Sequence, residues 1–321
     1  MTSGAMKAAV AGAQGFGFAE VARPRPGPSQ LLVRVRAAAL NRADLGTLAG
    51  EPRVLGMECA GEVVEAGAEA SGFRAGDRVM CSGAAGFAEY AVVDWGRAMH
   101  MPVGGMSWQQ AACLPLALQT MHDAIVTNGR LRAGEAVLIQ GASSGVGLMG
   151  LQIARLMGAA TVIGTSTDSA RRMRLAEFGA GIALDSADPG WPQLAAAANG
   201  GAGIDLIVDQ LAGPLANQNL AAAAVQGRIV NVGRMAGKHG DFDFDLHALK
   251  RIRYIGVTFR TRSVQEVREI TSRALADLGP FLRSGTLGLP IDSVFRFGEL
   301  DKAFDRMRAN RHFGKIIVAM D

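Results

Sequence analysis

The chain has 321 residues, of which 49% are hydrophobic and 19% charged, and its net charge of +4 is small and scattered, which argues against a nucleic-acid-binding surface. Its three widely spaced cysteines, Cys59, Cys81 and Cys113, exclude a disulfide framework and a CxxC metal site. No apolar run reaches the roughly 20 residues of a membrane span, and residues 1–11 lack the hydrophobic region of a signal peptide, so a cytoplasmic location with no membrane partner is expected.

The first third of the chain has the residue pattern of short strands. Val33 and Val35 alternate with Arg34 and Arg36, the period of a half-buried strand. Strands are expected at residues 31–40, 56–67, 77–81 and 86–94, a spacing typical of a small barrel-like β domain.

A helix is expected over residues 107–128. Ser107 and Gln110 form a capping box at its start, and Pro115 should kink or divide it. We place the boundary into the second domain near Leu116.

From residue 136 onward, strands alternate with helices. The expected strands are residues 136–140, 161–166, 182–185, 205–210, 228–233 and 254–259. Six strands with crossover helices predict a parallel, doubly wound sheet, so the fold class is α/β and a ligand should lie beyond the carboxyl ends of the strands. A long amphipathic helix at 263–284, a short helix at 300–308 and a strand at 315–319 should return the chain to the first domain.

Residues 136–158 predict a phosphate-binding unit made of a strand, a small-residue turn and an apolar helix. A Cβ atom at Gly145 or Gly147 would hold a pyrophosphate off the backbone or the helix off the sheet. The predicted pyrophosphate contacts are Ser144, Gly145, Val146 and Gly147. The spacing departs from the plain G-x-G-x-x-G pattern, so a glycine-rich turn without a ligand is the alternative.

The loop after the second strand of this domain bears on the choice of dinucleotide. Thr165 and Ser166 stand where an NAD site usually has Asp or Glu, and small hydroxyls leave room for a 2′-phosphate. Arg171 can bind that phosphate through two charge-assisted hydrogen bonds, which predicts NADPH. Alternatively, Arg171 and Arg172 form a solvated helix face; Asp168 is expected to cap that helix.

Several motifs, in order along nearly the whole chain, carry a family resemblance. They are ALNRADL (39–45), LGMECAGEVVEAG (55–67), AGDRV (75–79), GFAEYAVV (86–93), GASSGVG (141–147) and HFGKIIV (312–318). With them the chain resembles the zinc-independent medium-chain dehydrogenases/reductases of the quinone oxidoreductase (zeta-crystallin-like) group. ALNRADL and FRTR (259–262) look most like its p53-inducible quinone reductase branch.

The resemblance implies a GroES-like catalytic domain of residues 1–116 and 260–321 and a Rossmann NADPH-binding domain of residues 117–259. It also implies a homodimer joined through the strand at 254–259. A small-molecule quinone or enone is the expected partner, and no nucleic acid is expected.

The sequence departs from the zinc alcohol dehydrogenases that share this fold. A catalytic zinc would need a Cys near residues 41–44 and a His beside Glu58, but no Cys is there and position 57 is Met57. We therefore expect no metal. Without a Lewis acid, hydride transfer to an electron-poor quinone or α,β-unsaturated carbonyl is the expected chemistry.

By motif position, the resemblance also implies roles for individual residues. Asn41 is expected beside the nicotinamide and substrate with Asp44 close by, and Thr120 near the carboxamide or ribose. His122 stands where the group commonly has an aromatic residue and is the candidate proton donor. The alternatives are structural: Asn41 bonds to local backbone, and His122 merely fills space. Further expected cofactor contacts are Gly233, Arg234 and Phe259, and Lys315 is a weaker candidate for binding a phosphate of the cofactor.

Together these residues predict direct hydride transfer from NADPH to a quinone, promoted mainly by orientation in a water-poor cleft. One alternative is reduction of the double bond of an enone or enoyl thioester. An alternative of another class is an NADPH-binding structural or RNA-binding protein, because the group includes proteins with such roles.

Overall fold

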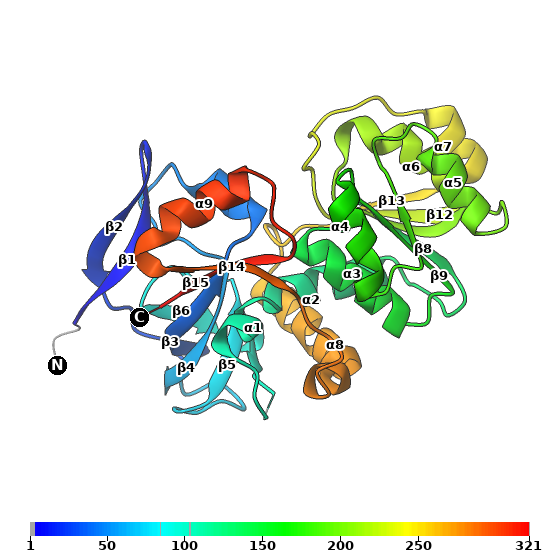
Figure 1. Ribbon diagram of the computed structural model, residues 1–321. Helices are drawn as coiled ribbons and strands as arrows, with labels where there is room; N and C mark the ends of the chain where they lie inside the picture. Colours follow the sequence, from blue (N-terminus) through cyan, green and yellow to red (C-terminus); the bar gives the residue numbers. More distant parts are fainter. Residues whose placement is uncertain (1–3, 84, 103, 321) are drawn as a thin grey trace. The chain divides into compact units, whose positions relative to one another are not determined.

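The computed structural model describes residues 4–320 except residues 84 and 103 (Figure 1). The chain forms two compact units, the first made of Met1–Leu116 and Ser263–Asp321 and the second of Ala117–Arg262. The first unit is therefore discontinuous in sequence, and the second boundary lies a few residues beyond the expected position between residues 259 and 260.

The first unit is built on a seven-stranded sheet in the order β14-β15-β3-β4-β5-β7, with β6 also pairing with β3, and a separate β1-β2 hairpin. The C-terminal strand β15 runs parallel to β14 and antiparallel to β3, so the tail rejoins this unit as expected. The strands are β1 (Ala5–Gly12), β2 (Gly15–Ala22), β3 (Gln30–Ala39), β4 (Glu58–Ala66), β5 (Arg78–Ser82), β6 (Tyr90–Asp94), β7 (Ala98–His100), β14 (Ile291–Arg296) and β15 (Lys315–Ala319).

The helix expected over residues 107–128 is divided, as Pro115 allows. Helix α1 (Trp108–Ala112) ends before Cys113, and Pro115 starts α2 (Pro115–His122), where its missing N–H costs no helical hydrogen bond. A turn of π-helix, η3 (Asp123–Asn128), follows α2. The other helices of the first unit are η1 (Arg42–Thr47), η2 (Trp95–Arg97), α8 (Val264–Arg283), η6 (Phe297–Glu299) and α9 (Leu300–Arg308).

Helix α8 begins after the predicted capping box of Ser263 and Glu266. Its Arg268 donates two hydrogen bonds to Asp94, at 2.9 and 2.7 Å, and lies over the ring of Trp95. The helix is amphipathic, with Val267, Ile270, Ala274 and Leu278 among its buried residues. In the part of the chain that the structure describes, no helix has the length and apolar character to cross a membrane.

The second unit contains a six-stranded parallel sheet in the order β10-β9-β8-β11-β12-β13. This is the strand order of a doubly wound sheet. From β8 the chain adds β9 and β10 on one side, and it then returns to add β11, β12 and β13 on the other side. The strands are β8 (Ala136–Ile139), β9 (Thr161–Thr165), β10 (Ile182–Leu184), β11 (Ile204–Asp209), β12 (Ala223–Asn231) and β13 (Arg253–Gly256).

Helices α5, α6 and α7 pack next to one another beside this sheet (Figure 1). The helices of the second unit besides α2 and η3 are α3 (Gly145–Leu156), α4 (Ser169–Met173), η4 (Arg174–Phe178), α5 (Trp191–Ala198), η5 (Gly213–Leu215), α6 (Ala216–Ala222) and α7 (Phe244–Lys250). The sequence did not predict α5 or α7: α5 is an alanine-rich segment with little alternation, and α7 has no buried residue.

Two strand boundaries differ from expectation. The strand expected at 254–259 ends at Gly256, so Phe259 lies beyond it, in the connection toward α8. Strand β12 begins at Ala223 and continues through Gln226, which has a positive φ of 63°. The strand was expected to begin at residue 228, so its observed start is five residues earlier.

Candidate active and cofactor site

A buried polar cluster in the first unit contains the predicted site residues Asn41 and Lys315 together with Glu58. The Nδ2 atom of Asn41 donates to Oε1 of Glu58 at 2.9 Å, and Nζ of Lys315 donates to Oδ1 of Asn41 at 2.9 Å. Lys315 also forms an ion pair with Glu58, and Oε2 of Glu58 accepts the N–H of Leu116 at 2.9 Å. Both ends of the Asn41 amide are thus bound, which fixes its orientation.

The sheet of the first unit brings these residues together. Ala39 at the end of β3 is opposite Ile317 of β15, and Ala38 is opposite Cys59 of β4. The first residues of β15 and β4, Lys315 and Glu58, therefore lie beside the end of β3, where Asn41 follows. Bonding of the Asn41 side chain to local backbone, the alternative role, is only a minor contribution. The distance from its Nδ2 atom to the carbonyl oxygen of Ala39 is long, at 3.5 Å.

Asp44 lies in η1 and is only 1% exposed. Its Oδ2 accepts the backbone N–H of Asn41 at 2.7 Å, while Oδ1 has no hydrogen-bond partner among the described residues. Burial raises the pKa of Asp44 to about 7, against the lowering effects of the Asn41 N–H and of Lys315. The side chain can therefore hold or release a proton close to neutral pH.

Asp44 should give the protein a distinctive pH dependence. An unfolded aspartate ionises with a pKa of about 3.9, whereas the pKa of Asp44 in the folded protein is about 7. Between these values the folded protein holds a proton that the unfolded chain has lost, so the free energy of unfolding should fall as the pH rises and level off above the folded pKa. Urea denaturation between about pH 5 and pH 8 measures this slope. The slope should diminish in Asp44→Asn, and an equal slope in the variant would assign the effect to other groups.

Lys315 was a weaker candidate for phosphate binding. Its side chain is 4% exposed, and its ammonium group is bound to Glu58 and Asn41. It could reach a phosphate only by breaking a buried ion pair. In the structure, Lys315 instead neutralises Glu58 and holds the amide of Asn41.

The small-residue turn of the second unit lies between β8 and α3. Ser144 caps α3, with its Oγ accepting the N–H of Gly147 at 3.0 Å. A Cβ atom on Gly147 would lie 2.6 Å from Cα of Ala142 and 2.6 Å from the carbonyl oxygen of Gly141. The turn therefore brings Ser144, Gly145, Val146 and Gly147 together at the helix N-terminus, the arrangement that suits a pyrophosphate.

Thr165 and Ser166 support this turn from β9. The hydroxyl of Thr165 donates to Oε1 of Gln140 at 2.7 Å and accepts the N–H of Gly141 at 3.1 Å. Ser166 donates to Oγ of Ser143 at 3.1 Å. Both side chains are buried, so their hydroxyls fix the turn to the sheet, and room beside them for a 2′-phosphate stays a prediction.

Gln210 is a supporting residue that the sequence reasoning missed. Its Nε2 donates to the carbonyl oxygen of Gln140 at 2.8 Å, and its Oε1 accepts from Ser144 at 3.2 Å. It comes directly after β11, on the other side of β8 from Thr165. In the sequence, the position of Gln210 directly after an apolar strand could have indicated this supporting role.

The charged residues at the start of α4 have different roles. Asp168 caps α4, as expected, by accepting the N–H of Arg171 at 2.8 Å. Arg172 donates to the carbonyl oxygen of Ser166 at 2.8 Å and to Asp185 at 3.0 Å, so its guanidinium group serves the structure. Arg171 has a longer contact with Asp168, at 3.6 Å, and stays the candidate for a 2′-phosphate.

The remaining predicted residues lie on different elements of the second unit. Thr120 and His122 belong to α2, and His122 is buried at its end. Gly233 and Arg234 follow β12, and a Cβ on Gly233 would lie 2.5 Å from the carbonyl oxygen of Gln210. This close backbone approach explains the glycine. Phe259 is in the connection after β13.

Within residues 4–320, leaving out 84 and 103, no group of three or more His, Cys, Asp or Glu side chains is placed to hold a metal ion. The ammonium group of Lys315 lies against Glu58 instead.

Comparison with known proteins agrees with this division of the chain. Residues 27–103 match the alcohol dehydrogenase GroES-like domain, and residues 145–276 match the domain described as zinc-binding dehydrogenase. The chain belongs to the medium-chain dehydrogenase/reductase family. It is thus an oxidoreductase, and the family confirms the predicted α/β class with a GroES-like domain and a Rossmann-like parallel sheet.

Members similar to this chain include much longer proteins. A highly reducing polyketide synthase of Emericella nidulans is 28% identical over 91% of the chain, and the lovastatin diketide synthase of Monascus pilosus is 30% identical over 89%. The chain spans 12% of the length of each. The crystal structure of an NAD-dependent alcohol dehydrogenase is 26% identical, with a TM-score of 0.87 over 98% of this chain and 100% of that one.

Proposed function

We propose that the protein is a nicotinamide-dependent reductase of the carbon–carbon double bond in α,β-unsaturated thioesters. The observation that carries the proposal is its similarity, over nine-tenths of its length, to polyketide synthases that are named highly reducing. Polyketide intermediates are thioesters, and complete reduction of their β-carbonyl group proceeds through a conjugated double bond. These relatives favour the enoyl thioester alternative over the quinone that the sequence resemblance implied.

The second unit supplies the groups that would hold the cofactor. The N-terminus of α3, with Ser144, Gly145 and Gly147, suits the pyrophosphate. The nicotinamide, when bound, supplies a hydride to the β-carbon of the acceptor. The α-carbon then needs a proton, for which Asp44 and His122 are our two candidates. Asp44 has a suitable acidity, because burial raises its pKa to about 7.

We propose that this reaction proceeds without zinc. The residues of the first-unit cluster do not fit a divalent cation, because the ammonium group of Lys315 already provides the positive charge beside Glu58. Met57 stands at the position of the expected histidine ligand, and a thioether is a poor ligand for zinc. The Asn41 amide, held by Lys315 and Glu58, is the rigid polar group that would orient the substrate carbonyl or nicotinamide.

An acceptor screen tests the proposed reaction. Crotonyl-CoA, a 2-alkenal and 1,4-naphthoquinone are compared under steady-state conditions with NADPH and with NADH. We expect kcat/KM for the enoyl thioester to exceed that for the quinone by at least about tenfold, roughly 1.4 kcal/mol of transition-state binding. Faster turnover of the quinone, with none of the thioester, would return the assignment to a quinone reductase.

We further propose that NADPH is the preferred cofactor, with Arg171 as the 2′-phosphate ligand. Arg171→Leu should raise KM for NADPH by about tenfold or more, the loss of one charge-assisted interaction, and leave KM for NADH nearly unchanged. Arg174→Leu is the matched control, because Arg174 is paired with the exposed Glu177 in the next helical turn. A wild-type protein that uses NADH as well as NADPH would contradict this preference.

A further inference from the structure

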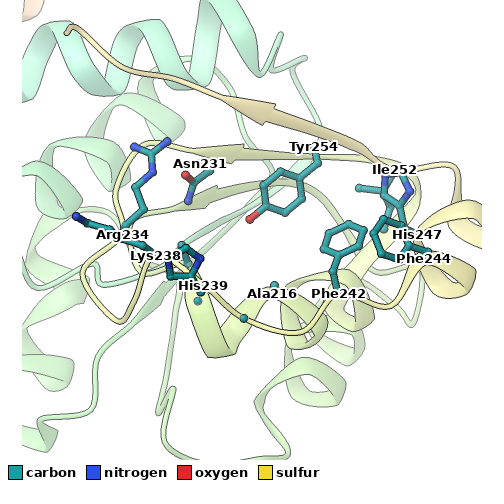
Figure 2. A pocket seen from close by; sticks show the side chains of 13 residues that line it. Ala216, Asn231, Arg234, Lys238, His239, Phe242, Phe244, His247, Ile252 and Tyr254 are labelled. Carbon is teal, nitrogen blue, oxygen red and sulfur yellow. The ribbon is translucent and has the colours of Figure 1, made fainter.

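A cavity in the Rossmann-like unit is lined by residues outside the phosphate-binding turn. It has a volume of about 730 Å³ and lies beside the carboxyl end of β12 and the first residues of β13, among the loop after β12 and the starts of α6 and α7 (Figure 2). None of its lining residues belongs to the turn at 141–147 or to the arginine-bearing helix α4. The volume is in the range of small-molecule sites, about 300–1,000 Å³.

Positive and imidazole side chains line this cavity without any carboxylate. Arg234, Lys238, His239 and His247 contribute to its wall. Within the described chain none of the four forms an ion pair. The nearby Asp241, Asp243 and Asp245 are not among the lining residues, and Oδ1 of Asp243 accepts the N–H of Leu246 at the start of α7. The charges on the cavity wall itself, from Arg234 and Lys238, are therefore positive.

The opposite side of the cavity is aromatic. The ring of Phe242 packs edge-on against Phe244 and Tyr254, with ring centres 5.0 and 5.8 Å apart. Phe244 is 75% exposed, an unusual position for so large an apolar ring. Figure 2 shows Arg234, Lys238 and His239 toward one end of the cavity and Phe242 and Phe244 toward the other. A ligand with two chemically different ends would match this separation.

The Tyr254 hydroxyl points into the space between these two ends (Figure 2). Burial and the nearby Asp209 raise the pKa of Tyr254 to about 12, so the phenol keeps its proton and can donate it. Its present acceptor, Oδ2 of Asp209, is 3.5 Å away. The Oδ1 atom of Asp209 already accepts the backbone N–H groups of Leu211 and Ala212. The Tyr254 hydroxyl can therefore exchange its long hydrogen bond to Asp209 for one to a ligand, with little loss of free energy.

We propose that this cavity binds a small anionic molecule in which a flat aromatic group carries one carboxylate, sulfonate or phosphate. The anion lies against Lys238, His239 and Arg234, and the aromatic group lies against Phe242 and Phe244. The site is distinct from the pyrophosphate site at α3 and does not depend on which acceptor the enzyme reduces.

Two fluorescent probes that differ in charge test the proposal on the full chain. 8-Anilinonaphthalene-1-sulfonate carries a sulfonate on an aromatic group, and N-phenyl-1-naphthylamine is its neutral counterpart. In Lys238→Gln/His239→Gln the dissociation constant of the sulfonate should rise about tenfold or more, the loss of one to two charge-assisted contacts, and that of the neutral probe should not change. Phe244→Ser should weaken binding of both probes.

Arg253→Gln is the matched control, because it removes one positive charge from the same strand as Tyr254. Neighbouring residues of a strand point to opposite faces of the sheet, so Arg253 faces away from the cavity. Far-ultraviolet circular dichroism checks that each variant is folded. An equal loss of sulfonate binding in Arg253→Gln would overturn the proposal. So would equal binding of the two probes by the wild type, or competitive displacement of the sulfonate by NADPH, which would assign the cavity to the cofactor.

Discussion

Lys315→Met is expected to lower the free energy of unfolding by about 3–5 kcal/mol. The side chains of Lys315 and Glu58 are 4% and 0% exposed. Removal of the ammonium group leaves the carboxylate of Glu58 buried with only the N–H groups of Asn41 and Leu116 as partners. An uncompensated buried charge is among the most destabilising changes that one substitution can make.

Urea denaturation followed by circular dichroism measures this loss. Lys302→Met is the matched control, because Lys302 is paired with Glu299 on the surface, with side chains 64% and 39% exposed, and should change stability by less than about 1 kcal/mol. In Lys315→Met/Glu58→Gln the unpaired charge is gone, so a large part of the stability should return. If Lys315→Met were as mild as Lys302→Met, the buried pair would not have the importance we assign to it.

Gly147→Ala is expected to weaken dinucleotide binding by at least about a hundredfold. The reason is the loss of close contact between the N-terminus of α3 and the charged pyrophosphate. The added Cβ would lie 2.6 Å from both Cα of Ala142 and the carbonyl oxygen of Gly141. These are backbone atoms, so α3 must move away from the turn. The same displacement should cost about 1–3 kcal/mol of stability through overpacking.

Isothermal titration calorimetry with NADPH and with NADH measures the binding loss. Gly181→Ala is the control in the same unit. A Cβ atom on Gly181 would lie 3.8 Å from the carbonyl oxygen of Val162, which is an ordinary van der Waals distance. Near-wild-type affinity in Gly147→Ala, in a protein that remains folded, would mean that the pyrophosphate is held elsewhere.

The fold was largely predictable because its main elements follow simple patterns. The six strands of the parallel sheet are apolar runs bounded by glycine or polar residues, and each was expected within a few residues of its observed position. The division at Pro115 follows from the chemistry of proline. The surface helix α7 was missed because propensity and pattern carry little information where no residue is buried.

The site was less predictable, because a residue's neighbours decide which way its polar groups point. Nothing in the sequence near Thr165 indicates that its hydroxyl donates to the distant Gln140. Lys315 was chosen for its charge, yet Glu58 from a distant strand takes that charge. In contrast, the residues of the turn were predicted together, because backbone geometry and small side chains act locally.

The position of β15 between β14 and β3 has a consequence for the order of events during synthesis. The second unit is a continuous stretch of chain and can fold as soon as it leaves the ribosome. The first unit must wait, because the strand that joins β14 to β3 in its sheet is translated after the whole second unit. That strand also carries Lys315, so Glu58 stays without its counter-ion until β15 has been translated. The half-made first unit is therefore the species that most needs protection from aggregation or proteolysis in the cell.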